Sequence, residues 1–260
     1  MEHFLFLDKE LDLYETNLKG HWDAMDLSSI SKDQWNNVNM WSDSNQNYDL
    51  MTSNPDYRPK YVTNAINSLS AIDFSGKNVG LVSEHKYSNG PNDPFTWIMA
   101  VQTKASDNQT PQNIFSTSDN NWQGLNINRA DFYPVAASTH GIHVWVGKTE
   151  DQIKSLKLPK DKLIILSVKY DGKVASISWG MNEKGSVTPS SDSIWRKGQP
   201  GYVAMGLAIQ NNRHDYSGYI GEVLAYDVEL ESSILEKMIV AMSTKWTTGK
   251  SWNKSGYHFQ

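Results

Sequence analysis

Residues Ser217 to Trp246 read SGYIGEVLAYDVELESSILEKMIVAMSTKW and carry two structural signals in succession. The first part alternates as a β-strand does, which predicts two faces: Ile220, Glu222, Leu224 and Tyr226 on one, and Tyr219, Gly221, Val223 and Ala225 on the other. After Asp227 the period becomes helical, with one apolar stripe at Ile234, Leu235, Met238, Ile239, Met242 and Trp246. The sequence therefore predicts a strand that runs directly into a short amphipathic helix.

Both ends of this helix carry signals of their own. Ser233, with Glu236 three residues later, has the form of a capping box that would satisfy the first free amides. Gly249 lies just beyond the last apolar position, where a left-handed residue commonly ends a helix. The pattern predicts a helix that starts near Ser233 and stops before Gly249.

Further strands are predicted outward from this stretch. Residues 95–102 are apolar on both faces, which is typical of a central strand. Asp171-Gly172 separates two alternating runs, at 163–170 and 173–179, and this dipeptide is a strong hairpin signal. Residues 61–66, 69–74 and 201–209 are also strand-like. With no internal repeat and no low-complexity tract, one domain is the economical interpretation.

Four blocks in the first part of the chain agree with this reading of its end. They are Trp22-Asp23-Ala24, Val38 to Ser44, Arg58 to Val62, and Ala71 to Gly76. Together with the closing G-x-I-x-E-V-x-x-Y pattern, they resemble the laminin-G-like, concanavalin-A-like lectin and glucanase family over about Trp22 to Trp246. The resemblance implies an all-β fold: a two-sheet antiparallel jelly-roll sandwich with a short C-terminal helix, over residues 21–260. Such a fold hosts many functions.

Composition restricts the classes of function. The chain has 260 residues, a net charge of −5 and no cysteine. The absence of a basic block argues against nucleic acid and anionic membranes as partners, and no apolar run approaches the length of a membrane span. The N-terminus, Met1-Glu2-His3, does not have the form of a secretion signal, so we expect the chain to be made in the cytoplasm.

Residues 1–20 fall outside the resemblance, and we treat them as an N-terminal arm or an extra segment. They could pack on the sandwich or dock on a neighbouring subunit. Glu10, Asp12 and Glu15 within them match the E-x-D-x-x-E signature of laminarinase- and lichenase-type glycoside hydrolases. Those enzymes need carboxylates on one face of a strand. Because the signature lies on an inner strand in those enzymes and nothing precedes it here, we favour chance spacing.

Tryptophans beside amides and carboxylates suggest sugar binding, because a flat indole face accepts the C–H face of a sugar while polar groups take its hydroxyls. Trp35, Trp41, Trp122 and Trp195 lie in such surroundings. The best instance is Asn120-Asn121-Trp122-Gln123. The alternative for each is a tryptophan that anchors its loop. Our glycan-binding candidates are Trp122, Asn120, Asn121, Gln123, Trp41 and Trp195.

Acidic and amide residues also gather in loops, at Asp119, at Asn211 with Asp215, and between Asp43 and Asp49. Such oxygen-rich loops could hold Ca²⁺. Asn and Asp are also common turn residues, and we favour that interpretation. We expect no other cofactor.

These observations lead to two main hypotheses and a variant. The first is a non-enzymatic structural or adhesion module on a virion or another extracellular surface, such as a phage decoration or fibre-like protein. It would form a homo-oligomer or a larger assembly and could bind surface glycans. The second is a glycoside hydrolase that uses Glu10, Asp12 and Glu15, or a free lectin. A purely structural subunit without a ligand is the variant of the first.

Overall fold

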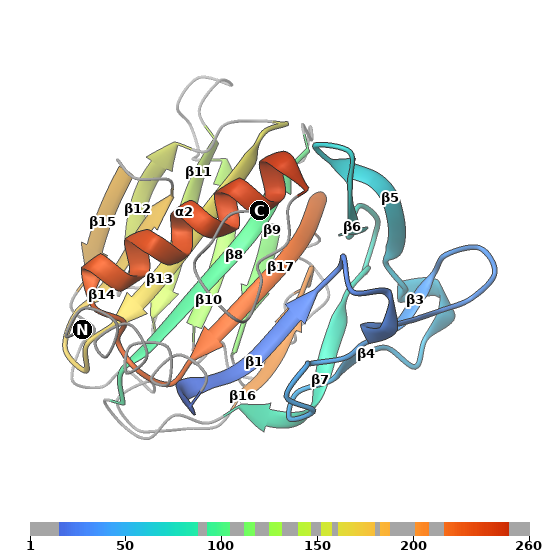
Figure 1. The fold of residues 1–260 in the computed structure, drawn as a ribbon, viewed down its shortest axis with the longest axis horizontal. Helices are drawn as coiled ribbons and strands as arrows, with labels where there is room; N and C mark the ends of the chain where they lie inside the picture. The colour runs from blue at the N-terminus through green and yellow to red at the C-terminus, as the bar shows by residue number, and fades with distance from the viewer. Residues whose placement is uncertain are drawn as a thin grey trace, which may run out of the picture.

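The structure is a computed structural model that describes residues 16–87, 93–104, 112–117, 125–131, 140–146, 152–157, 161–179, 183–187, 201–207 and 216–249. Within these ranges the chain forms two antiparallel sheets, one behind the other, with one long helix across the outer face of the front sheet (Figure 1). The predicted all-β two-sheet sandwich with a C-terminal helix is confirmed. Among the described residues, no helix has both the length and the apolar character needed to cross a membrane.

The front sheet, called sheet A, contains eight of the described strands in the order β15-β14-β13-β8-β17-β6-β5, with β1 also paired to β17. Their bounds are β1 (Leu18–Asp23), β5 (Lys60–Ile66), β6 (Leu69–Asp73), β8 (Phe95–Thr103), β13 (Leu163–Tyr170), β14 (Ala175–Trp179), β15 (Glu183–Val187) and β17 (Gly218–Tyr226).

The rear sheet, called sheet B, contains nine described strands in the order β12-β11-β10-β9-β16-β7-β4-β3-β2. Their bounds are β2 (Ile30–Lys32), β3 (Val38–Trp41), β4 (Leu50–Met51), β7 (Leu81–Tyr87), β9 (Gln112–Ser116), β10 (Leu125–Asp131), β11 (His140–Val146), β12 (Gln152–Lys157) and β16 (Gly201–Met205). Two short 3₁₀ helices, η1 (Leu27–Ser29) and η2 (Pro55–Tyr57), lie in the connections.

The space between the sheets is filled by a large aromatic core. The Trp97 ring lies 4.3 Å from Phe115 and 6.3 Å from Trp22, measured between ring centroids. Trp97 belongs to β8, which is buried on both faces as predicted, because Trp97 and Met99 face this core while Ile98 faces the helix. The predicted hairpin is also present, since Asp171 and Gly172 lie in the connection between β13 and β14.

A second core lies between sheet A and the helix α2 (Ser232–Thr248). The predicted stripe from Ile234 to Trp246 is buried in full, and Gly249 ends the helix in the left-handed conformation with φ 74°. The predicted capping box is wrong. The residue that caps the helix is Glu231, whose carbonyl accepts from the Ile234 and Leu235 amides, so Ser233 already lies inside the first turn.

Strand β17 departs from the alternation predicted for it. Ile220 pairs with Val101 of β8 and Glu222 pairs with its neighbour Ala100, so Gly221 is an extra residue in a β-bulge. The bulge moves Ile220 to the core between the sheets and leaves Glu222 on the helix side. The prediction that placed Ile220 and Glu222 on one face is therefore wrong.

The predicted boundary after residue 20 cuts through a strand. β1 starts at Leu18, and Leu18 and Gly20 pair with Tyr226 and Ala225 of β17. Residues 18–20 therefore belong to the sandwich and not to an arm. Residues 1–15 lie outside the described part of the chain.

Candidate functional site

Most of the predicted site residues lie outside the described part of the chain and stay predictions. They are the glycan candidates Asn120, Asn121, Trp122, Gln123 and Trp195, the calcium candidates Asp119, Asn211 and Asp215, and the hydrolase candidates Glu10, Asp12 and Glu15.

Trp41 is described, and the prediction that it binds a glycan is wrong in this structure. Its side chain is 0% exposed and belongs to the core between the sheets. Asn39 and Asp43 made its local sequence look polar, but β3 directs the indole inward. A sugar cannot reach either face of this ring. Trp35 differs, because its side chain is 69% exposed.

The loop from Asp43 to Asp49 is closed by backbone amides of the loop itself and of β1. The buried Asp43 carboxylate accepts hydrogen bonds from four amides: His21 N (2.7 Å), Asn45 N (3.1 Å), Asn47 N (3.1 Å) and Tyr48 N (3.3 Å). Asp49 in turn accepts from the Asp43 amide. A carboxylate surrounded by N–H donors supports the turn interpretation, which we favoured for this loop.

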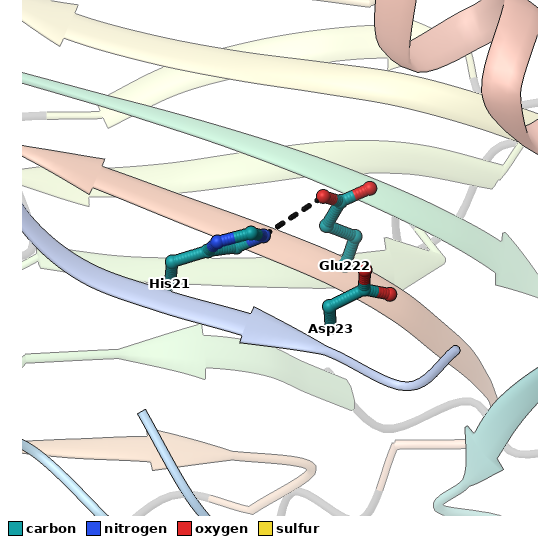
Figure 2. A group of neighbouring side chains, drawn as sticks. All are labelled: His21, Asp23 and Glu222. Carbon is teal, nitrogen blue, oxygen red and sulfur yellow. Dashed lines mark hydrogen bonds and ion pairs between the residues drawn. The ribbon is translucent and has the colours of Figure 1, made fainter. Parts of the chain in front are cut away.

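One group of chemically active side chains was not found from the sequence. His21 and Asp23 of β1 and Glu222 of β17 point toward one another on the helix side of sheet A (Figure 2). One ligand atom of each lies within 4.8 Å of the others, which is close enough to hold a metal ion. The His21 Nε2 atom lies 2.9 Å from Glu222 Oε1.

Lys245 of α2 already supplies a cation to this group. Its Nζ atom donates to Asp23 Oδ2 at 2.7 Å and to Glu222 Oε2 at 2.8 Å. The neighbouring Trp246 donates from Nε1 to the same Glu222 oxygen, also at 2.8 Å. The Lys245 ammonium therefore neutralises the two carboxylates that a metal ion would need.

Room for the Trp246 ring is created by the bulge in β17. A Cβ atom on Gly221 would lie 2.4 Å from Cη2 of Trp246, closer than two carbons can approach. The missing side chain lets the indole rest on the strand backbone and bring its N–H to Glu222. The bulge, the helix end and the charge cluster thus form one unit.

The charges in this unit fix its protonation state. Burial alone would raise the pKa of Glu222, but the Lys245 ammonium and the His21 ring outweigh it and hold the pKa at about 2. Burial would lower the pKa of Lys245, but Glu222 and Asp23 raise it above its usual value. Glu222 is ionised at all but very acidic pH, so it is unsuited to donate a proton as a glycosidase acid must. The cluster has the chemistry of a structural clamp between α2 and sheet A.

Two features of the sequence could have drawn attention to this clamp but were not used. Glu222 is a charged residue in an apolar strand, and Lys245 lies between Met242 and Trp246 on the apolar side of the helix. The partners His21 and Glu222 are 201 residues apart, so only the fold brings them together.

Known proteins resemble this chain in structure but not in sequence. No protein-family model and no curated protein matches the sequence. Trypanosoma rangeli sialidase aligns with a TM-score of 0.59 and 13% identity, over 88% of this chain and 33% of the sialidase chain. Our chain thus spans about a third of the sialidase.

Two further solved structures align with comparable TM-scores. Domain 4 of a GH43 extracellular arabinanase from Geobacillus stearothermophilus, in complex with arabinotriose, aligns with a TM-score of 0.58 and 15% identity, over 86% of this chain and 98% of that domain. A GH54 α-L-arabinofuranosidase variant aligns with a TM-score of 0.56 and 10% identity, over 78% of this chain and 50% of that one. Identities this low show the shared β-sandwich fold alone.

Proposed function

We propose that this chain is a carbohydrate-binding β-sandwich of the concanavalin-A-like type, which binds oligosaccharides without cleaving them. One observation carries the proposal: the chain is nearly coextensive with domain 4 of the arabinanase, since the alignment covers 98% of that domain. That domain is described in complex with arabinotriose. A whole-domain match to a sugar-bound β-sandwich supports sugar binding more directly than the partial match to the sialidases.

The chemistry of the clamp supports binding without catalysis. Hydrolysis needs one carboxylic acid that can give up a proton and a second carboxylate beside it. Glu222 and Asp23 are close together, but both carboxylates accept hydrogen bonds from the Lys245 ammonium, and the pKa of Glu222 is about 2. This pair therefore lacks the acid.

The proposal is tested by titrating the purified chain with arabinotriose and with a panel of neutral and sialylated oligosaccharides, using calorimetry. We expect heat of binding for a neutral oligosaccharide and no release of reducing ends. No binding to any member of the panel would contradict the proposal.

Turnover would favour the hydrolase alternative instead. In that case Glu10→Gln should abolish release of reducing ends and leave the melting temperature unchanged, because a catalytic carboxylate contributes to the reaction and not to the fold. Asp12→Asn and Glu15→Gln would then identify its partner.

The place where such a domain acts is a further part of the proposal. We propose a virion surface or another extracellular surface, with the chain assembled into an oligomer and Ca²⁺ as an optional ligand. Light scattering of the chain with and without residues 1–17 tests the assembly. The truncation ends before Leu18, because β1 starts there. A monomer in both forms would contradict an assembly mediated by this segment.

A further inference from the structure

The turn between β2 and β3 is held by one carboxylate. Asp33 Oδ1 accepts from the backbone amides of Trp35 and Asn37, both at 2.9 Å, and Asp33 Oδ2 accepts from the Asn37 side-chain amide at 2.9 Å. Asn36 takes the left-handed conformation with φ 64°, and its amide donates to the Asp33 carbonyl. The hydrogen bond from Asn37 lowers the pKa of Asp33, so the carboxylate is ionised at neutral pH.

The same turn is attached to the other sheet. The Asn36 carbonyl accepts from the Tyr61 amide at 2.8 Å, and the Val38 amide donates to the Pro59 carbonyl at 2.7 Å. Asn37 forms a β-bridge with Lys60 at the start of β5. The turn is therefore fixed internally by Asp33 and externally by the edge of sheet A.

This fixed turn presents a large aromatic side chain to solvent. Trp35 is 69% exposed, whereas Trp22, Trp41, Trp97 and Trp246 are each 0% exposed. Its neighbours in the chain, Gln34 and Asn36, are also exposed and carry amide groups. Lys32 donates to the Asn36 side-chain oxygen, so this lysine is engaged within the turn.

We propose that the Trp35 turn is a sugar-binding platform, on which the indole face stacks against one neutral sugar ring of an oligosaccharide. This inference rests on the proposed function, because it assigns the site at which that function is exerted. A rigid indole contributes a flat apolar face at little cost in conformational entropy. The Gln34 amide and the side-chain NH₂ of Asn36 lie beside it in the chain and can serve the sugar hydroxyls.

A sugar fits this surface better than a protein does. Stable protein interfaces bury roughly 800 Å² per partner around an apolar centre. Here a single ring is followed and preceded by exposed polar side chains, which suits one sugar unit. The two nearby cations are already engaged within the protein, Lys32 with Asn36 and Arg58 with Asp33 at 3.8 Å, so a neutral sugar is the ligand to test first.

The test compares three variants of the full chain, titrated with arabinotriose first and then with the neutral oligosaccharide that wild type binds best. We expect Trp35→Ala to weaken binding by about tenfold or more, which corresponds to loss of one aromatic contact. Trp35→Tyr retains an aromatic face and should bind within about threefold of wild type. Leu27→Ala is the matched control, since Leu27 is 61% exposed but has no ring.

A second readout reports on the ring itself. Saturating oligosaccharide should protect part of the tryptophan emission of wild type from quenching by acrylamide. In Trp35→Ala this protection should be absent, because the remaining tryptophans with described side chains are buried or half-buried.

The outcomes separate the two proposals. If wild type binds an oligosaccharide and Trp35→Ala binds it equally well, the platform is overturned and the proposed function stands, with the Trp122 group as the next site to vary. If wild type binds no oligosaccharide, the proposed function fails and the platform fails with it. If Trp35→Ala changes the mass in solution but not the sugar affinity, the ring covers a second copy of the chain, which also overturns the platform.

Discussion

Trp246 and Trp35 each lie beside a carboxylate, but one ring is buried and the other is exposed. The Trp246 ring is fully buried over Gly221 and donates its Nε1 hydrogen to Glu222. Trp35 donates its backbone amide to Asp33, and its ring remains in solvent. In the first case the carboxylate secures the side chain. In the second it secures only the backbone, and the ring remains available for contact with a partner.

The difference shows that a tryptophan ring becomes buried where the backbone leaves space for it. A bulge without a side chain receives one ring, and a tight turn exposes the other. Perturbing the two regions should therefore change different properties: stability at the clamp, binding at the turn.

The largest effect is expected from Lys245→Ala. The change leaves Glu222 and Asp23 without their cation in a buried setting, and breaking a buried pair in this way costs about 3–5 kcal/mol. Urea unfolding followed by circular dichroism measures the loss. Lys237→Ala, an exposed position on the same helix, serves as the control. Equal stabilities of the two variants would show that the clamp contributes little.

A somewhat smaller effect is expected from acid. The pKa of Glu222 falls from 4.5 to about 2 on folding, so its contribution to stability is complete above pH 4.5 and is lost as the pH falls toward 2. That contribution amounts to roughly 3 kcal/mol. Unfolding free energies measured between pH 5 and pH 2 should therefore decline more steeply for wild type than for Glu222→Gln, which has no carboxyl group to protonate. Parallel curves would argue that Glu222 titrates normally.

Gly221→Ala should produce a moderate loss. The new Cβ would lie 2.4 Å from Trp246, and overpacking of this kind costs about 1–3 kcal/mol. The melting temperature reports the change. The clash is absent from the double variant with Trp246→Leu. Its loss of stability should therefore be smaller than the sum of the losses of the two single variants. Strict additivity would mean that the ring and the bulge do not interact.

The smallest effect on stability is expected from Trp35→Ala. An exposed side chain away from the core usually changes the unfolding free energy by no more than about 0.5 kcal/mol. The same urea experiment, with Leu27→Ala alongside, measures it. A loss comparable to that of Gly221→Ala would show that the ring packs on other parts of the protein.

Periodicity in the sequence predicted much of the fold. The apolar stripe of α2, the helix end at Gly249 and the central strand β8 all follow from local spacing, and each is present. The predicted capping box failed because two serines lie side by side, and the helix starts at the first of them, Ser232. The predicted alternation of β17 failed because of the β-bulge. The single extra residue shifts the alternation by one position, and nothing in the local pattern marks it.

The site was less accessible to sequence reasoning. Trp35 and Trp41 both have polar residues close by in the sequence, yet one is 69% exposed and the other 0%. What separates them is whether the residue lies in a turn or in a strand whose inner face meets another sheet. The clamp escaped because its partners come from β1, β17 and α2, and only tertiary packing brings them together.

The burial of Lys245 affects how this protein can be immobilised on a sensor surface. Its side chain is only 6% exposed, so reagents that modify amines should leave it unreacted in the folded protein. Lys32 and Lys60 are exposed and lie at the Trp35 turn, where such reagents would attach. Random amine coupling would then preserve the fold while blocking the proposed platform. A chip that carries the chain through a terminal tag would keep the indole free and give a fair measure of sugar affinity.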